Sequence, residues 1–334
     1  MKKGRSSFVL SVLVLLSSLG AGVAAAQVPA DVEAKLRQIG RVVDAPGTAL
    51  IYGPILKSQS YDGVEFTRDQ AYGPEARNKL DVATPKAKPG TPLQVLIYVP
   101  GGVGNKKMDY PGGEPFYDNI MIMAVKNGLV GVNVQRRSGQ PLGWDAGGHD
   151  VANAIAWVRA NIARFGGDPN RVVIWGQSAG SNALSVYLSH PDLYSAGGVG
   201  VKGAVLMSGG YNLLPLEPKA QNGPQGPGDR GAAAGGAAPA PQAPPPVDRA
   251  VQLQRSSLPG LKALTIPVFV LAAELDPERT VELSVLLKDQ LCAAGHCPKY
   301  QLNKNQSHMS QVMGINSADT SVSGPVFAWI KSVK

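Results

Sequence analysis

Apolar runs alternate along the chain with segments whose apolar residues recur at helical spacing. From Leu93 onward the runs lie at 93–99, 129–134, 171–175, 203–207 and 266–272, with a short strand near Tyr300. Apolar runs of this length are typical of strands that are buried on both faces. Apolar residues recur at helical spacing in residues 149–164, 179–188 and 280–291, and a last helix is predicted to end at 329–333. This alternation predicts an α/β fold, with a mostly parallel central sheet flanked by helices.

Two regions depart from the alternating pattern. The stretch around Val64–Thr67 precedes it and is expected to add antiparallel strands at the sheet edge. Residues 215–246 are nearly all Gly, Pro, Ala and Gln, with little apolar surface to bury, so we expect a flexible insertion there. A linker between two domains is the alternative. Because the strands on either side belong to one series, we predict a single domain over residues 27–334.

The first 26 residues have the composition of a secretory signal peptide. A basic end at residues 2–5 precedes an apolar run at 8–19, and Ala24–Ala26 supply small residues for cleavage before Gln27. The apolar run is shorter than the ~20 residues that span a bilayer, so a stable membrane anchor is not expected. The mature protein is therefore expected to be periplasmic or secreted.

Composition limits the classes of partner. The hydrophobic fraction of 44% indicates a chain that buries a sizeable core. The net charge of +8 includes three positive charges in the first five residues, and the remaining charge is scattered. Nucleic acid is therefore not an expected partner, because no basic run interleaves with aromatic residues. The sequence leaves the oligomeric state open.

The chain has two cysteines, Cys292 and Cys297. In an oxidising compartment a close pair of this kind predicts a disulfide, with Gly295 permitting a turn at the end of the preceding helix. A metal site is the alternative, but His296 between the cysteines does not complete a ligand set. We therefore predict a structural disulfide and no metal.

The strongest chemical signal is the pattern G-x-S-x-G at Gly176–Gly180, directly after an apolar strand and before a helix. A nucleophilic serine at a tight strand-to-helix turn needs neighbours with almost no side chain. The N-terminus of the following helix directs free backbone N–H groups at a developing oxyanion. An ordinary turn is the alternative for the bare pattern, but this context predicts Ser178 as the nucleophile.

The stretch from Asp150 to Ser181 resembles the carboxylesterase and hormone-sensitive-lipase-like families of α/β-hydrolases, especially bacterial acetyl- and feruloyl-esterase-like members. The resemblance is carried by Ala156–Val158, Phe165–Arg171 and Gly176–Gly180, and it extends from about Tyr61 to the C-terminal helix. It implies the α/β-hydrolase fold and a serine esterase.

The resemblance also implies that the loop after the first long strand completes the oxyanion hole. These families usually carry His-Gly-Gly-Gly there, whereas this chain has Pro-Gly-Gly-Val-Gly at residues 100–104. Gly101 and Gly102 match, and their N–H groups are expected to donate alongside that of Ala179. Pro100 supplies neither a side-chain donor nor an N–H.

A serine hydroxyl needs a general base. In this fold the order along the chain is serine, acid, histidine, which excludes His149. His308 lies after the last predicted strand, where the resembled families place their catalytic histidine. Glu274 and Asp276 both follow the strand at 266–272. Asp276, which precedes a proline as in the family pattern, is preferred, and Glu274 stays open as the alternative.

These residues predict a carboxylic ester hydrolase with a Ser178–His308–Asp276 triad and no cofactor. The expected substrate is a small-molecule or polysaccharide-linked ester with a short acyl group, because the 215–246 segment has no apolar face with which to form a lid. A prolyl-oligopeptidase-like serine peptidase is an alternative, but about sixty residues before the first core strand are too few for a propeller domain. A non-catalytic α/β-hydrolase-like binding protein is another, and such proteins lose the serine or the histidine.

Overall fold

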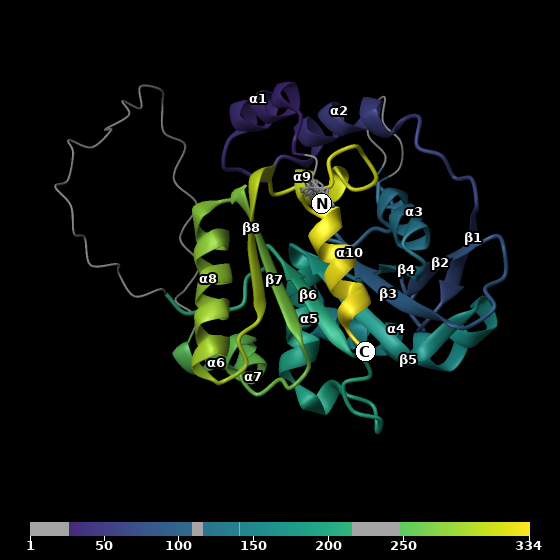
Figure 1. Ribbon diagram of the computed structural model, residues 1–334. Helices are drawn as coiled ribbons and strands as arrows, with labels where there is room; N and C mark the ends of the chain where they lie inside the picture. The colour runs from purple at the N-terminus through teal and green to yellow at the C-terminus, as the bar shows by residue number, and fades with distance from the viewer. Residues whose placement is uncertain (1–26, 109–115, 140, 216–247) are drawn as a thin grey trace, which may run out of the picture.

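One sheet organises the molecule (Figure 1). The computed structural model describes residues 27–108, 116–139, 141–215 and 248–334. In spatial order, the sheet contains β1 (Val64–Ala71), β2 (Lys79–Pro85), β4 (Val130–Gln135), β3 (Leu93–Val99), β5 (Gly167–Gln177), β6 (Gly203–Met207), β7 (Val268–Leu275) and β8 (Lys299–Ser307). The six strands from β4 to β8 are parallel, and β1 and β2 add an antiparallel edge. The predicted α/β-hydrolase sheet is confirmed.

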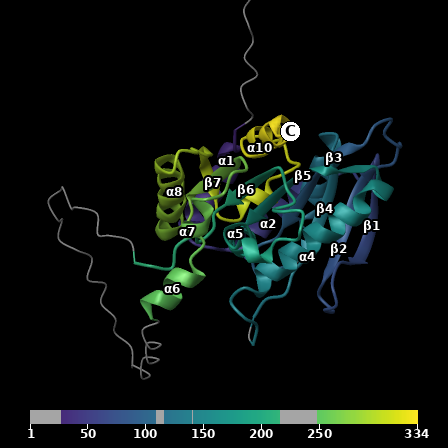
Figure 2. The ribbon, with the colours of Figure 1, turned by 90° about the horizontal axis from the view of Figure 1, so that it is seen from below.

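Helices cover both faces of this sheet. One face packs on α4 (Ala146–Asn161), α5 (Ala179–Ser189) and α8 (Glu278–Ala293), and the other on α1 (Ala30–Ile39), α2 (Ala45–Leu56), α3 (Asp118–Lys126), α9 (Ser310–Met313) and α10 (Ser323–Ser332). Figure 2 shows α10 on one side of the strands and α4 with α5 on the other. Shorter helices are η1 (Ile162–Phe165), η2 (Pro191–Leu193), α6 (Arg249–Arg255) and α7 (Leu258–Leu261).

The alternation of side chains along β3 explains the two layers. Ile97 and Val99 join the cluster that contains α4 and α5, whereas Leu96 and Tyr98 join the cluster on the other face. All four are fully buried. Successive side chains of a strand point to opposite faces, so a continuous apolar run feeds two cores at once.

The N-terminal helices were not predicted from the sequence. The sequence of α2 contains Pro46, Gly53 and Pro54, residues that form helices poorly. It is helical because the Asp44 side chain caps the first turn and because Tyr52 is buried in the core. Tertiary packing therefore outweighs local propensity in this segment.

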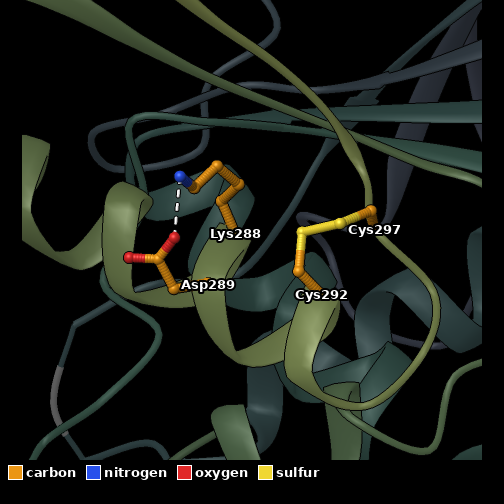
Figure 3. Close-up of a disulfide and its surroundings, with 4 residues drawn as sticks. All are labelled: Lys288, Asp289, Cys292 and Cys297. Atoms are coloured by element: carbon orange, nitrogen blue, oxygen red, sulfur yellow. Dashed lines mark ion pairs between the residues drawn. A yellow bond between two sulfur atoms is a disulfide. The ribbon is translucent and has the colours of Figure 1, made fainter.

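The predicted disulfide between Cys292 and Cys297 is present (Figure 3). Cys292 lies in the last turn of α8, near the exposed ion pair of Lys288 and Asp289, and Cys297 precedes β8. Gly295 turns the chain between the cysteines with a φ of +88°. The bond ties the end of α8 to the start of the last strand.

Two predictions fall on residues outside the described part of the chain. They are the signal peptide at residues 1–26 and the insertion at 215–246, of which the structure describes Pro215 alone. Among the helices that the structure does describe, none has the length and apolar character needed to span a membrane.

Candidate active site

The candidate site lies where the parallel strands end. Ser178 follows β5, Asp276 follows β7 and His308 follows β8, and these strands lie in the parallel part of the sheet, where β6 separates β5 from β7 and β8 is the neighbour of β7. The carboxyl ends of parallel strands share one edge, which is where open α/β sheets bind ligands. Residues more than a hundred positions apart in the sequence therefore meet at one edge.

Ser178 occupies the strained turn that the pattern predicts. Its φ of 54° and ψ of −125° are unusual for a residue with a side chain. Two hydrogen bonds hold this conformation: its N–H donates to the carbonyl of Met207 at 2.9 Å, and its carbonyl accepts from the N–H of Asn182 at 3.0 Å. Backbone hydrogen bonds from β6 and α5 thus hold the serine at the start of a helix.

Close packing explains the glycines around this serine. A Cβ on Gly176 would lie 2.7 Å from the Cα of Ser181, and one on Gly180 would overlap the backbone of the loop after β3. A Cβ on Gly101 would lie 3.0 Å from the Cβ of Ser178. The loop after β3 and the first turn of α5 are therefore in close contact.

His308 and Asp276 form a buried pair. The Nδ1 atom of His308 lies 2.6 Å from Oδ1 of Asp276, and their side chains are 4% and 0% exposed. The other oxygen of Asp276 accepts from the Oγ–H of Ser208 and the N–H of Ala273, both at 2.7 Å. A carboxylate only accepts, so it fixes the tautomer in which Nδ1 of His308 carries the proton.

The other ring nitrogen of His308 is buried and has no hydrogen-bond partner among the described residues, Ser178 included. Two contacts nevertheless join the histidine and serine regions. The Gln177 side chain donates to the carbonyl of His308 at 3.3 Å, and Met309 lines the same cavity as Ser178. Hydrogen bonds between nucleophile and base are often looser before substrate binds.

Glu274 faces a different set of partners. Its Oε2 accepts from the N–H of Asn305 at 2.8 Å, and its carboxylate lies 3.9 Å from both Arg37 and Lys304. It is partly exposed, with 28% of its side chain accessible. Of the two carboxylates considered from the sequence, the structure places Asp276 against the histidine.

Sequence reasoning missed the residues that hold Asp276. Ser208 directly follows β6 and has a φ of 51°, and Gln311 donates to its hydroxyl at 2.8 Å. Nearby, the Tyr211 hydroxyl accepts from the N–H of Gly209 at 3.1 Å, and burial raises the pKa of Tyr211 to about 12. The only signal for Ser208 was its position at the end of a predicted strand.

A cavity of about 490 Å³ opens at Ser178. Its walls are mainly apolar, with a few polar groups, which is typical of small-molecule sites. It is lined by Val43, Ala45, Gly101, Gly102, Val103, Asn105, Lys107, Met108, Tyr117, Ser178 and Met309. Val43, in the connection between α1 and α2, and Ala45, the first residue of α2, contribute part of the wall, so a region whose helices the sequence did not predict borders the cavity. Within the described ranges, no cluster of three or more His, Cys, Asp or Glu side chains could hold a metal ion.

Residues 78–222 match the model of the carboxylesterase family. The chain is similar to Esterase LipQ of Mycobacterium tuberculosis, at 39% identity over 36% of this chain and 28% of that protein. It is also similar to liver carboxylesterase of Sus scrofa, at 35% identity over 38% of this chain and 22% of that protein. The chain thus covers less than a third of the length of these curated relatives.

Solved structures match over most of the chain. A bacterial heroin esterase superposes with a TM-score of 0.61 at 19% identity, over 92% of this chain and 98% of that one. A thermostable esterase from Pseudomonas putida superposes with a TM-score of 0.60 at 17% identity, over 93% and 98%. At such identities the likeness concerns the fold. The chain therefore has the fold of these esterases, and residues 78–222, less than half of it, are similar to the carboxylesterase family.

Proposed function

We propose that this protein is an exported serine carboxylesterase that uses Ser178, His308 and Asp276 as its catalytic triad. The observation that carries the proposal is the buried His308–Asp276 pair, 2.6 Å apart, on the strand edge that also presents Ser178 to a cavity. The similarity of residues 78–222 to the carboxylesterase family supports the same reaction class.

The residues divide the chemistry among them. Ser178 Oγ attacks the ester carbonyl carbon while Nε2 of His308 takes its proton, and Asp276 stabilises the imidazolium that forms. Backbone N–H groups of Gly101, Gly102 and Ala179 stabilise the oxyanion of the tetrahedral intermediate. His308 then returns the proton to the leaving alcohol, and water hydrolyses the acyl-enzyme by the same steps. This sequence of steps uses no cofactor.

The cavity supports a preference for short acyl groups. Its 490 Å³ is in the lower half of the range for small-molecule sites, and apolar side chains such as Met108 and Met309 line it. A small ester, free or attached to a polysaccharide, fits this description. Export is supported by the disulfide of Cys292 and Cys297, since disulfides persist in oxidising compartments.

The test is hydrolysis of p-nitrophenyl esters from acetate to palmitate, by the parent protein and by Ser178→Ala. We expect the parent to favour acetate or butyrate, and Ser178→Ala to lose the activity while keeping its circular dichroism spectrum. A phosphonate should label Ser178 alone, by peptide mass spectrometry. The exposed Ser332→Ala is the matched control and should behave as the parent. Turnover retained by Ser178→Ala, or cleavage of a prolyl anilide in preference to every ester, would contradict the proposal.

A further inference from the structure

The loop after β3 has its carbonyl groups held by hydrogen bonds. The carbonyl of Gly101 accepts from the N–H of Gly104 at 3.0 Å. The carbonyl of Gly102 accepts from Nη2 of Arg136 at 2.8 Å, and the carbonyl of Gly104 accepts from the backbone N–H of Arg136 at 3.0 Å. Arg136 directly follows β4, the neighbour of β3, so it reaches this loop from the adjacent strand end.

Of the four carbonyls of residues 101–104, the remaining one is held in the same manner. That of Val103 accepts from Nη2 of Arg77 at 2.9 Å and from the hydroxyl of Ser138 at 2.8 Å. The same nitrogen of Arg77 also donates to the side-chain oxygen of Asn105 at 2.8 Å. Two arginines therefore fix the orientation of successive peptide groups.

The direction of these carbonyls determines the direction of the N–H groups. In a trans peptide the C=O of one residue and the N–H of the next point in opposite directions. The N–H groups of Gly102 and Val103 have no hydrogen-bond acceptor among the described residues. Both residues line the cavity at Ser178, whereas Arg136 does not. The carbonyls of Gly102 and Val103 thus point to the two arginines, and the N–H of Val103 points away from Arg136, in a residue that lines the cavity.

Arg136 is unusual in lacking a hydrogen-bonded carboxylate. Its side chain donates to the carbonyls of Gly102 and Arg137, and its Nε has no partner among the described residues, although Arg136 is only 5% exposed. The nearby carboxylate of Asp150 is bound by Arg137 at 2.7 and 2.9 Å. Burying a guanidinium in this way is costly, and burial lowers the pKa of Arg136.

A positive charge at the carbonyl of Gly102 makes the N–H at the other end of the same peptide group a stronger hydrogen-bond donor. Hydrogen bonds in series polarise one another, so a cation bound to the Gly102 carbonyl makes the N–H of Val103 a better donor. Gly104 leaves room for this contact, because a Cβ there would lie 2.5 Å from Cγ of Arg136, and its φ is +73°.

We propose that Arg136, assisted by Arg77, is a positioning residue of the oxyanion hole. It orients and polarises the Gly102–Val103 peptide, so that the N–H of Val103 donates to the oxyanion together with those of Gly102 and Ala179. This inference rests on the proposed esterase function. The N–H of Val103 then takes the place of that of Gly101 among the three donors.

The test compares Arg136→Met, Arg136→Lys and Arg77→Met with the parent. Loss of one oxyanion donor lowers kcat by about 10²–10³. We expect this loss for Arg136→Met with KM within about threefold, a smaller loss for Arg136→Lys, and about tenfold for Arg77→Met, the value of one hydrogen bond. Arg164→Met is the matched control, since Arg164 precedes β5 at the end opposite Ser178, and it should leave kcat unchanged.

A trifluoromethyl ketone separates positioning from general stability, because Ser178 adds to it to form a stable oxyanion. Its affinity should fall in parallel with kcat across the variants, while the affinity of the alcohol product stays constant. Unchanged kcat in folded Arg136→Met, or a fall in kcat without weaker ketone binding, would overturn the inference. If Arg136→Met does not fold, Arg77→Met decides by the same two measurements. A parent that neither hydrolyses esters nor binds the ketone would overturn this inference and the proposed function together, whereas an active parent with unaffected variants would overturn this inference alone.

Discussion

Replacing Asp276 with asparagine would test the buried acid at almost constant volume. In the native site, one oxygen of Asp276 lies 2.6 Å from Nδ1 of His308, and the other accepts from the N–H of Ala273 at 2.7 Å. A backbone N–H can only donate, so the carbonyl oxygen of the new amide must occupy the position near Ala273. The amide NH₂ then faces His308.

This orientation puts a donor against Nδ1, so the neutral imidazole must carry its proton on Nε2. His308 in that tautomer cannot accept the proton of Ser178. A comparable replacement in other triads lowers kcat about 10⁴-fold, which corresponds to about 5 kcal/mol of transition-state stabilisation. We expect a loss of this size with KM changed little, because the cavity walls are untouched.

The assay is initial-rate hydrolysis of p-nitrophenyl butyrate, with urea unfolding to confirm that Asp276→Asn is folded. Glu274→Gln is the matched control, because a glutamine oxygen can still accept the hydrogen bond from the N–H of Asn305. It should keep kcat within about threefold, since its exposed ion pairs contribute little. A loss below tenfold for Asp276→Asn, or a larger loss for Glu274→Gln, would refute the assignment of the acid.

Three further predictions concern stability. Replacing both Cys292 and Cys297 with alanine should lower the free energy of unfolding by about 2 kcal/mol, because the bond closes a short loop with a sequence separation of 5, and kcat should not change; a decrease above 4 kcal/mol in urea unfolding would show another role. Gly180→Ala should lower the free energy of unfolding by about 3 kcal/mol, because the added methyl group overlaps the backbone, and should greatly lower kcat. Gly90→Ala, which has open space around it, should leave the melting temperature unchanged. Equal melting curves for the two variants would contradict this prediction. Burial raises the pKa of Tyr211 from about 10 in the unfolded chain to about 12 in the folded one. The neutral phenol therefore stabilises the folded state fully below pH 10, and this stabilisation is lost as the pH rises to 12. Between pH 10 and 12, the free energy of unfolding in urea should fall by about 3 kcal/mol less for Tyr211→Phe than for the parent. Equal decreases in the two proteins would count against this prediction.

The sequence alone determined the sheet and the position of the tight turn at Ser178. Both are local signals: apolar runs of strand length predict buried strands, and Gly176–Gly180 between a strand and a helix predicts a tight turn. The positive φ of Ser178 agrees with that turn. The strand boundaries were less accurate, since β5 begins at Gly167 and β8 extends to Ser307. Backbone pairing with neighbouring strands decides where a strand ends, and the pattern of apolar residues does not predict this pairing.

Tertiary structure was needed to distinguish Asp276 from Glu274, since both follow the same apolar strand. The turn after β7, in which the N–H of Asp276 bonds the carbonyl of Ala273, directs this carboxylate inward, while Glu274 accepts from Asn305 on β8. The assignment of Asp276 as catalytic acid stays a prediction until the asparagine variant is measured.

The residues that hold the loop after β3 and the carboxylate of Asp276 were also not evident from the sequence. Arg136 and Arg77 lie 34 and 26 positions from the residues whose carbonyls they hold, and Ser208 lies 68 positions from Asp276. Each is an ordinary polar residue at or near the end of a strand, with no motif around it. Pairing in the sheet, parallel or antiparallel, brings these positions together whatever their separation in the chain, so the contacts depend on the order and direction of the strands, which only the folded structure specifies.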